Sequence, residues 1–477
     1  MECLAAGRGI SLPASATGMA QLAVRAVGGY ARVRQQFKTP IGRFEGIEET
    51  LARMGGNLYM MDAARVLTAT AIDLAQKPAV ISGITKLHLT ERGRQVVIDG
   101  MDVVGGKGIC MGPSNFIGAA YMQLPVMITV EGANILTRSL IVFGQGAIRC
   151  HPHVLKEIEA TREPDREKAS IAFDRALFAH LGFTLSNFAR TFVMGITGAH
   201  FVRVPSGVAP ETRRYYQQLT RFSAAFALLA DLAMATLGGT LKRKEKLSAR
   251  LGDILSLLYL CSATLKRFED EGRQHGDAPL MHWAIWDAMF KAQNAFEGVI
   301  SNFPNRVVAA VMRAAAFPLG RPYVVPPDRL GQRAARILIE PSPCRDRLTS
   351  AVYLSDSPDD PLAQIERALA AVVAAEPAEH KLRSVLKTGR LGANEEPGTG
   401  LDALVARAQT AGLITPAEAD AILVADELTA KVIRVDDFAQ DLGASEMRFT
   451  PAAMATSSAG KYKDAPMNRP SELERER

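Results

Sequence analysis

The sequence predicts an all-α fold, with a helical bundle over residues 1–149 followed by a long helical extension. Apolar residues recur three and four positions apart over long stretches, which is the pattern of helices packed on one side. Runs that alternate between apolar and polar residues, as strands would require, are scarce. Three apolar stripes mark the first region: Met19, Leu22, Ala23, Val27 and Tyr30; Ile47, Leu51, Met54, Leu58 and Met61; and Leu136, Leu140 and Phe143.

A second helical region runs from about residue 151 to residue 320 and carries two more stripes. The second of these stripes is long and regular, so it is either an internal core seam or a contact between subunits. An internal seam is the commoner arrangement. The stripes contain Leu219, Phe222, Phe226, Leu229 and Ala233, and then Leu247, Leu251, Ile254, Leu258, Cys261 and Leu265.

After residue 320 the character of the sequence changes. The proline-rich stretches GRPYVVPPD and IEPSPCRD are typical of extended connections. Residues 362–376 and 401–430 return to a helical pattern, and the polar tail is expected to be disordered. We therefore divide the chain into the bundle at residues 1–149, the extension at residues 150–445 and the tail at residues 446–477.

Composition is that of an ordinary soluble globular protein, with 48% hydrophobic and 22% charged residues. The net charge of +6 is spread over 477 residues, which suits anionic ligands but makes no strong case for nucleic acid. The five cysteines are far apart and show neither a disulfide framework nor a zinc spacing, which favours a reducing cytoplasm. The N-terminus does not have the pattern of a signal peptide.

One segment could be a membrane span by composition. Residues 222–241 are nearly all apolar and are followed by three basic residues, as at the positive flank of a spanning helix. Asp231, several alanines and a pair of glycines count against a span. We interpret the segment as a buried helix of a soluble bundle.

Three motifs follow one another in the first 149 residues: YARVRQQFKTPI at residues 30–41, MDVVGGKG at residues 101–108 and VEGANILTR at residues 130–138. They resemble, in order, the YAxxRxxFGxPI, QxxGGxG and YEGTxxIxR segments of acyl-CoA dehydrogenases. Any one of them alone would be a weak signal, whereas three in order are strong. The resemblance implies the family's C-terminal four-helix bundle for residues 1–149.

The resemblance continues through residue 440 or so. Four stretches look like the helical extension of the long bacterial acyl-CoA dehydrogenase: HPHVLKEIEA, RRYYQQLTRFSAAFALLADLAMATLGG, LKRKEKLSARLGDILSLLYLCSATLKRFEDEGR and NFPNRVV. The family fold also has an N-terminal helical domain and a middle β domain. We expect this chain to lack both domains, and with them much of the flavin site, as a fragment, a wrongly assigned start or a truncated product would.

The resemblance assigns the catalytic base to Glu131. In the family, a carboxylate takes the α proton of an acyl thioester while the β hydrogen leaves as hydride to FAD. Burial suits such a base, because the α proton is weakly acidic and the base must be aimed at it in a dry site. Developing enolate charge on the thioester oxygen needs hydrogen-bond donors, and in the family one donor is the backbone N–H of the catalytic glutamate. Without the motif, Glu131 would be read as an acidic residue at a helix N-terminus.

The resemblance also implies residues that bind FAD and the substrate. Arg34 matches the arginine that reaches the flavin pyrophosphate of a neighbouring subunit, and a guanidinium fork suits phosphate. A surface arginine is the alternative for Arg34, and plain core is the alternative for Phe37. The FAD-binding prediction comprises Arg34, Gln36, Phe37, Asp102, Gly105, Gly106 and Asn134, and the substrate-binding prediction comprises Arg8 and Gly132.

Gly105, Gly106 and Gly108 resemble a tight turn that lets backbone approach the cofactor. A Rossmann loop is rejected because a dinucleotide fingerprint needs a preceding strand, and the surroundings are helical. Three positions depart from the family pattern. Lys38 replaces a glycine, Ala133 replaces a threonine that contacts flavin, and Asp102 replaces a glutamine and would disfavour a nearby phosphate unless it faces elsewhere.

His151 and His153 form an HxH pair. Two histidines two positions apart share a direction on a strand but not on a helix. With no third ligand evident in the sequence, we predict no metal site.

The predicted function is that of an FAD-dependent acyl-CoA dehydrogenase of fatty-acid β-oxidation, acting on medium- or long-chain acyl-CoA to give trans-2-enoyl-CoA. The resemblance implies an electron-transfer flavoprotein or equivalent acceptor and a homo-oligomer. The alternative is an inert helical protein that oligomerises or lies on a membrane through the basic helix expected at residues 242–250. DNA binding lacks an aromatic platform or helix-turn-helix spacing. The expected location is cytoplasmic, with contact to the inner membrane possible.

Overall fold

The computed structural model describes residues 2–76, 78–388 and 400–436. The protein is 77% helical, so the all-α prediction is confirmed. Contacts divide the chain into two units, Met1–Arg434 and Val435–Arg477, and almost every described residue belongs to the first. The tail predicted at residues 446–477 lies outside the described residues. The domain boundaries placed at residues 149 and 445 stay a prediction.

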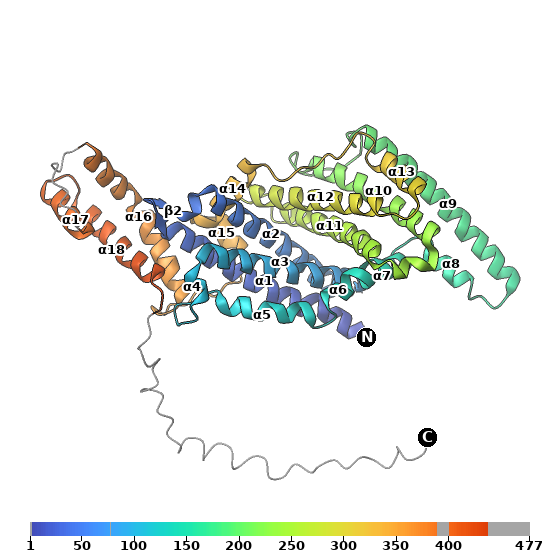
Figure 1. Ribbon diagram of the computed structural model, residues 1–477, viewed down its shortest axis with the longest axis horizontal. Helices are drawn as coiled ribbons and strands as arrows, with labels where there is room; N and C mark the ends of the chain where they lie inside the picture. Colours follow the sequence, from blue (N-terminus) through green and yellow to red (C-terminus); the bar gives the residue numbers. More distant parts are fainter. Residues whose placement is uncertain (1, 77, 389–399, 437–477) are drawn as a thin grey trace, which may run out of the picture. The chain divides into compact units, whose positions relative to one another are not determined.

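Four helices from the first 149 residues, α1, α2, α3 and α5, lie together (Figure 1). α1 contacts the other three, and α3 also contacts α2 and α5. The first two predicted stripes line the core between these helices, where Tyr30, Met54 and Leu58 are fully buried. The elements of this region are α1 (Glu2–Val33), β1 (Gln35–Gln36), β2 (Thr39–Pro40), η1 (Ile41–Arg43), α2 (Glu45–Asp73), α3 (Ala79–Val104), α4 (Gly106–Ile109), α5 (Gly118–Thr129), α6 (Asn134–Leu136), η2 (Thr137–Ile141) and α7 (Val142–Arg149).

The third predicted stripe is not a buried face. Phe143 is buried, but Leu136 and Leu140 are 45% and 38% exposed. The cause is the π-helical turn η2, which lies between α6 and α7. A π turn has more residues than an α turn and therefore shifts the side chains that follow it to another face.

The helices of the extension pack against one another and against the bundle. The long stripe of α11 is buried from Leu247 to Leu265, and α11 contacts α12 and α2. This stripe is therefore an internal seam, which is the commoner of the two arrangements considered from the sequence. The elements are α8 (Val154–Ala160), α9 (Arg166–Ile196), α10 (Arg213–Leu237), η3 (Gly238–Arg243), α11 (Glu245–Asp270), α12 (Ala278–Ser301), α13 (Arg306–Ala316), α14 (Asp328–Ile339) and α15 (Pro343–Leu348).

Bundle and extension approach closely where the bundle has glycine. A Cβ atom added at Gly28 of α1 would lie 2.3 Å from the carbonyl oxygen of Leu338 in α14. A Cβ atom added at Gly56 of α2 would lie 2.1 Å from the Trp283 ring of α12. Both distances are shorter than any van der Waals contact, so a larger residue at either position would push the helices apart.

The C-terminal helices are tied to the bundle by buried arginines. Glu366 of α16 accepts hydrogen bonds from Arg25 of α1 at 2.8 Å and from Arg345 of α15 at 2.5 Å. Arg345 also donates to the backbone oxygen of Arg25 at 2.9 Å. Satisfied buried charges of this kind fix the register of the elements that carry them. These helices are α16 (Pro361–Lys387), α17 (Leu401–Thr410) and α18 (Pro416–Ile433).

Two local predictions were wrong. The stretch IEPSPCRD is extended only at its start, because Ser342 caps the short helix α15 through its hydroxyl and Pro343 suits the first helical turn. The basic helix expected at residues 242–250 is divided, because η3 ends at Arg243 and α11 begins at Glu245.

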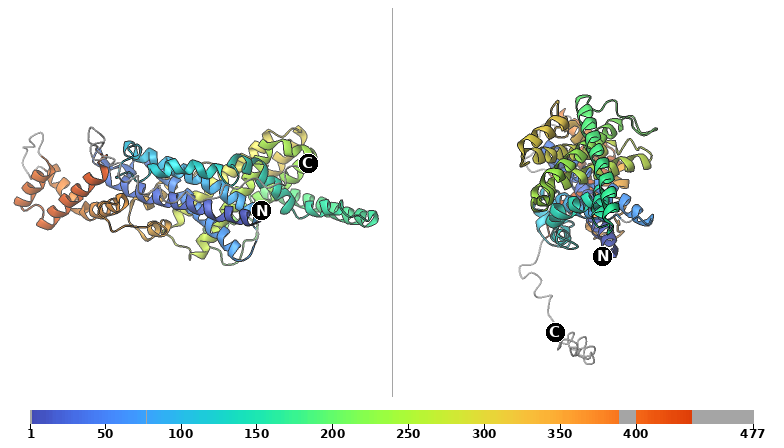
Figure 2. Two further views of the ribbon diagram at one scale, coloured as in Figure 1. Left: turned by 90° about the horizontal axis from the view of Figure 1, so that it is seen from below. Right: turned by 90° about the vertical axis from the view of Figure 1, so that its right-hand side faces the viewer.

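By length and composition one described helix, Arg213–Arg243, could cross a membrane. Polar side chains on α10 are nevertheless buried with protein partners. Gln217 donates to the backbone oxygen of His200 at 2.9 Å, and Arg221 donates to that of Ala316 at 3.0 Å. These bonds fit the interpretation of α10 as a core helix. Figure 2 shows α9, in green, reaching beyond its neighbours.

Candidate active site

Glu131 lies in a short turn between α5, which ends at Thr129, and α6, which begins at Asn134. Glu131 and Gly132 both have left-handed backbones, with φ of 53° and 91°. Glycine adopts this region freely, but glutamate does so at a cost of about 1 kcal/mol or more. Strain of this kind persists where the surroundings fix the conformation, and such residues are common at active sites.

The surroundings that fix this turn come from Lys86 of α3. Its side chain is fully buried. The ammonium group donates to the backbone oxygen of Gly132 at 2.8 Å and to Oδ1 of Asn134 at 2.7 Å. One lysine therefore holds the turn on both sides of Ala133. The only sign of Lys86 in the sequence is weak, a single charge within the apolar stretch SGITKLHL.

Asn134 completes the clamp. Its Nδ2 donates to Oγ1 of Thr90 and to Oε1 of Glu91, both at 2.9 Å. With Lys86 bound to its oxygen, the amide already uses both of its donor hydrogens and one acceptor site. The structure therefore gives Asn134 a positioning part in the turn. Its predicted contact with FAD stays a prediction.

The carboxylate of Glu131 lies beside two cations. Arg8 of α1 is adjacent, with Nη1 3.9 Å from the position of a Cβ atom on Gly132. Burial lowers the pKa of Arg8, and attraction to Glu131 opposes that shift. Burial likewise lowers the pKa of Lys86 to about 8, again opposed by Glu131. Oε2 of Glu131 is buried and has no hydrogen-bond partner among the described residues.

This arrangement leaves a carboxylate oxygen aimed at nothing the described chain provides. A buried polar atom without a partner costs about 1–3 kcal/mol, so such atoms in a native protein usually face a ligand, water or reacting group. Of the predicted residues, the structure brings together Arg8, Glu131, Gly132 and Asn134.

The other predicted residues lie at the far end of α1 (Figure 1). Arg34 follows Arg8 by 26 positions on nearly continuous helix, which corresponds to about 39 Å. Arg34 donates to the hydroxyl of Tyr30 at 2.6 Å. Gln36 is exposed at the start of a hairpin, whose register pairs Gln36 with Thr39.

The two loop residues of that hairpin, Phe37 and Lys38, have φ of 50° and 62°. Two-residue hairpin loops with positive φ at both positions strongly prefer asparagine and glycine. Phe37 is 91% exposed, so the alternative that it is plain core is wrong. An aromatic ring held outward on a strained turn is available for contact with another surface.

The predicted glycine turn forms at Gly105, which has φ of 67° and ψ of −139° and ends α3. Gly106 is already the first residue of α4. Both glycines and Asp102 are exposed. Asp102 contributes to raising the pKa of Arg53, although the largest cause of that shift is the bond from Arg53 to Asp99. Because Arg53 partly offsets the charge of Asp102, Asp102 would repel a nearby phosphate less than an isolated carboxylate would.

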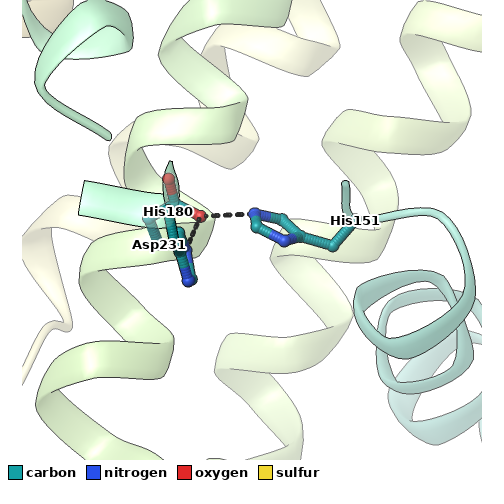
Figure 3. Close-up of side chains that lie close together, drawn as sticks. All are labelled: His151, His180 and Asp231. Atoms are coloured by element: carbon teal, nitrogen blue, oxygen red, sulfur yellow. Dashed lines mark hydrogen bonds and ion pairs between the residues drawn. The ribbon is translucent and has the colours of Figure 1, made fainter. Parts of the chain in front are cut away.

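The prediction of no metal site stays a prediction, but His151 of the histidine pair lies beside two candidate ligands that the sequence did not indicate. His151, His180 and Asp231 form a group whose ligand atoms all lie within 4.8 Å of one another (Figure 3). His180 belongs to α9 and Asp231 to α10, so no fixed spacing in the sequence could reveal them. His153 is near but is not one of the three.

The helical bundle with its strained acidic turn defines a class of protein, a helical domain in which a short turn between two helices carries a carboxylate. Family models give the family to which this domain belongs. The model for "Acyl-CoA dehydrogenase, C-terminal domain" matches residues 1–144, and that for "Acyl-CoA dehydrogenase, C-terminal, bacterial type" matches residues 148–438. The chain belongs to the acyl-CoA dehydrogenase family.

Two similar proteins show what share of a relative's length this chain matches. A 3-(aryl)acrylate reductase of Clostridium sporogenes is 31% identical over 144 residues, which are 30% of this chain and 37% of the reductase. The crystal structure of an acyl-CoA dehydrogenase complexed with FAD from Bacillus anthracis superposes with a TM-score of 0.52 at 21% identity. That match covers 70% of this chain and 55% of the other. The chain therefore spans between a third and somewhat over half of the length of these relatives.

Proposed function

We propose that this chain supplies the catalytic base of an FAD-dependent acyl-CoA dehydrogenase, and that Glu131 is that base. The reaction is the α,β-dehydrogenation of a medium- or long-chain acyl-CoA to the trans-2-enoyl-CoA, with electrons passed on to an electron-transfer flavoprotein or an equivalent acceptor. The observation that carries the proposal is the buried Oε2 of Glu131, which has no partner among the described residues and lies on a turn strained into one conformation.

The residues around Glu131 fit proton abstraction from a thioester. Among the described residues the backbone N–H of Glu131 donates to no carbonyl or side chain, so it is available to the thioester oxygen as charge develops there. Glu131 then accepts the α proton on its carboxylate. Arg8 and Lys86 are the basic groups beside this carboxylate. FAD, when bound, supplies the acceptor for the β hydrogen.

Lys86 prevents the turn from relaxing away from this geometry. If the bonds to Gly132 and Asn134 were lost, the left-handed backbone of Glu131 could revert to a lower-energy conformation, and the carboxylate would move. Misplacement of a base by about 1 Å can reduce a rate by about 100-fold. We therefore assign Lys86 and Asn134 as positioning residues.

The exposed surface near Glu131 fits an apolar substrate and further protein. Large apolar side chains are exposed on both sides of the turn, which is unusual for a finished protein surface. A middle β domain and an acyl chain would together cover them. They are Tyr121, Met122, Val126, Val130, Ile135 and Leu136.

The donor set at the far end of α1 fits a phosphate-bearing cofactor. Arg34 offers a guanidinium fork, Gly105 offers exposed backbone, and Phe37 offers an outward ring. Because about 39 Å of helix separates Arg34 from Arg8, we propose that the two ends serve different FAD molecules in a homo-oligomer. The scattered cysteines support a cytoplasmic location, to which peripheral contact with the inner membrane is a further proposal.

A second candidate reaction is reduction of an α,β-unsaturated acid derivative. It is favoured by the similarity to the 3-(aryl)acrylate reductase over 144 residues. Glu131 would then act as an acid that returns a proton to the α carbon, because the same geometry serves both directions. The substrate and the redox partner decide the direction.

The test uses the 477-residue chain assembled with the N-terminal and β domains of its family, loaded with FAD and kept anaerobic. Adding a long-chain acyl-CoA should bleach the visible flavin absorbance. Glu131→Gln should abolish the bleaching while FAD remains bound, and Glu163→Gln, an exposed carboxylate on the α8–α9 connection, should leave it intact. Bleaching that persists in Glu131→Gln would contradict the proposal. A protein whose flavin is never bleached by acyl-CoA but, after reduction with dithionite, is reoxidised by an arylacrylate would favour the reductase.

A further inference from the structure

The histidine cluster of the extension lies far from Glu131 in the chain and has no part in the proposed reaction. His151 occupies the connection between α7 and α8, His180 the middle of α9, and Asp231 the apolar helix α10 (Figure 3). Oδ1 of Asp231 lies 2.9 Å from Nε2 of His151 and 3.4 Å from Nε2 of His180. We propose that these three side chains bind a divalent transition-metal ion of the Zn²⁺ type, which fastens α9 to α10.

The first argument is the charge on Asp231. Its side chain is 2% exposed, and a buried carboxylate is unfavourable unless a cation pairs with it. Among the described residues, its ion-pair partners are the two histidines, and no lysine or arginine pairs with it. A neutral imidazole offers no positive charge to pair with the carboxylate. A metal ion would provide one.

The second argument is the proton on His180. Nδ1 of His180 lies 2.7 Å from Oε1 of Glu157. A carboxylate accepts and cannot donate, so the proton of a neutral His180 is on Nδ1. Nε2 then presents a lone pair toward Oδ1 of Asp231, and two acceptors would face each other at 3.4 Å. A cation between them removes this conflict.

The third argument is the support around the three ligands. A metal-binding histidine almost always gives its other N–H to a carboxylate, carbonyl or water, which fixes the ring, and Glu157 stands in that place for His180. Oδ2 of Asp231 accepts from the hydroxyl of Thr184 at 2.9 Å, which leaves Oδ1 for the ion. The ring of Phe183 lies edge-on to His151 at 5.5 Å and shields one side.

The ligand set suits zinc better than calcium or magnesium. Two imidazole nitrogens and one carboxylate oxygen are typical zinc ligands, whereas the harder ions prefer oxygen alone. Three protein ligands leave a fourth tetrahedral position for water.

Binding requires one local change, and that change gives the proposal a distinctive readout. Nδ1 of His151 accepts from the backbone N–H groups of His153 and Val154, each at 3.2 Å. In this state the proton is on Nε2, which donates to Asp231. Coordination through Nε2 moves the proton to Nδ1, so both long N–H contacts must be given up.

The site would add a fixed point near the middle of α9, which also packs against α8 but leaves large apolar side chains exposed in this part. Phe178, Leu181 and Leu185 are 70%, 51% and 70% exposed. The apolar cluster that holds α9 to α10 contains Met194 and Ala224 and lies near the C-terminal end of α9. A metal ion at His180 would hold α9 near its middle.

The experiment titrates ZnCl2 into the metal-stripped 477-residue chain by calorimetry, with Cys110 and Cys150 changed to serine because both thiols are exposed. We expect one ion per chain. Asp231→Asn and His180→Gln should each weaken binding by at least about 10-fold, and Glu157→Gln, which keeps all three ligands, by about 10–100-fold. His275→Gln, an exposed histidine, should bind as the parent does.

Two further measurements keep the outcome clear if a variant folds poorly. Circular dichroism checks each variant, and amide NMR of the parent should show that Zn²⁺ shifts the signals of His153 and Val154. Zinc binding that is equal in Asp231→Asn and the parent would overturn the proposal. So would a parent that binds no zinc, or one whose His153 and Val154 signals do not move.

Discussion

Two carboxylates with buried oxygens, Glu131 and Asp231, differ in the groups that surround them. Glu131 lies beside two basic side chains, Arg8 and Lys86, yet its Oε2 has no partner among the described residues. Asp231 has both oxygens engaged, but its partners are two histidines and a threonine. The first carboxylate keeps one buried oxygen without a partner among the described residues, whereas the second has both oxygens bonded and is paired with imidazole groups.

The backbone is strained at Glu131 and regular at Asp231. Glu131 has φ of 53° on a turn of four residues, while Asp231 lies within the regular helix α10. Strain at Glu131 must be held by other groups, which are Lys86 and Asn134. A carboxylate that is open, strained and clamped is typical of function, and one that is bonded within a helix is typical of structure.

The largest expected effect is on the rate of the reaction. Glu131→Gln in the assembled enzyme should lower kcat by about 10²–10⁴-fold or more, the contribution of a positioned base. The free energy of unfolding should fall by no more than about 1 kcal/mol, because Oε2 has no hydrogen-bond partner among the described residues and the change removes only the attraction to Arg8 and Lys86. Stopped-flow flavin reduction and urea denaturation measure the two quantities. A large loss of stability would mean that Glu131 is structural and would break the comparison.

Asp231→Asn should behave in the opposite way. In the metal-free chain it should lower the free energy of unfolding by about 2 kcal/mol, since a buried acceptor that serves His151 and Thr184 is altered. Flavin reduction in the assembled enzyme should stay within about twofold of the parent, because the cluster takes no part in the proposed chemistry. Urea denaturation of the chain treated with EDTA checks the first value. A variant as stable as the parent would show that the cluster carries no structural load.

Lys86 should make stability depend on pH. Its pKa is lowered to about 8 in the folded chain from an ordinary value of 10.5. Between these values the unfolded chain holds a proton that the folded chain has lost, so stability gains from this group as pH rises, and the gain is complete near the higher value. The parent should therefore gain stability relative to Lys86→Met from about pH 8 to about pH 10.

Urea midpoints of the two proteins at several pH values measure this difference. Lys86→Met should also be less stable at every pH, because Gly132 and Asn134 lose a donor. Lys291→Met is a suitable control, since that lysine has a lowered pKa but pairs with Asp287 and does not touch the turn. Parallel pH profiles for the parent and Lys86→Met would contradict the buried clamp.

Periodicity predicted the helices well because burial on one side imposes it directly. The seam of α11 and the stripes of α1 and α2 are examples, and their residues are buried as expected. The stripe through Leu136 and Leu140 failed because the π turn at residues 137–141 changes the number of residues per turn. Nothing in the residue types of that segment signals the change.

Only the part of the candidate site that lies within the three ordered motifs could be predicted from the sequence. The position of Glu131 before a helix that begins at Asn134 is confirmed, but its clamp by Lys86 was missed, because 46 positions separate Lys86 from Gly132. His180 and Asp231, which lie beside His151, were missed for the same reason. Contacts between helices depend on how the helices pack, and pairwise spacing along one chain does not encode that packing.

The smallest expected effect is on the free energy of unfolding, at a strained residue that has no part in the proposed reaction. Lys38 has φ of 62°, close to the value at Glu131, and stands where the family pattern has glycine. Lys38→Gly should raise the free energy of unfolding by about 0.5–1 kcal/mol, since glycine adopts this conformation without a steric penalty. Gly105→Ala should do the reverse, because φ of 67° with ψ of −139° is essentially restricted to glycine. If Lys38→Gly destabilises the chain, the lysine is held by contacts that outweigh its strain, and the hairpin would then resemble the Glu131 turn rather than contrast with it.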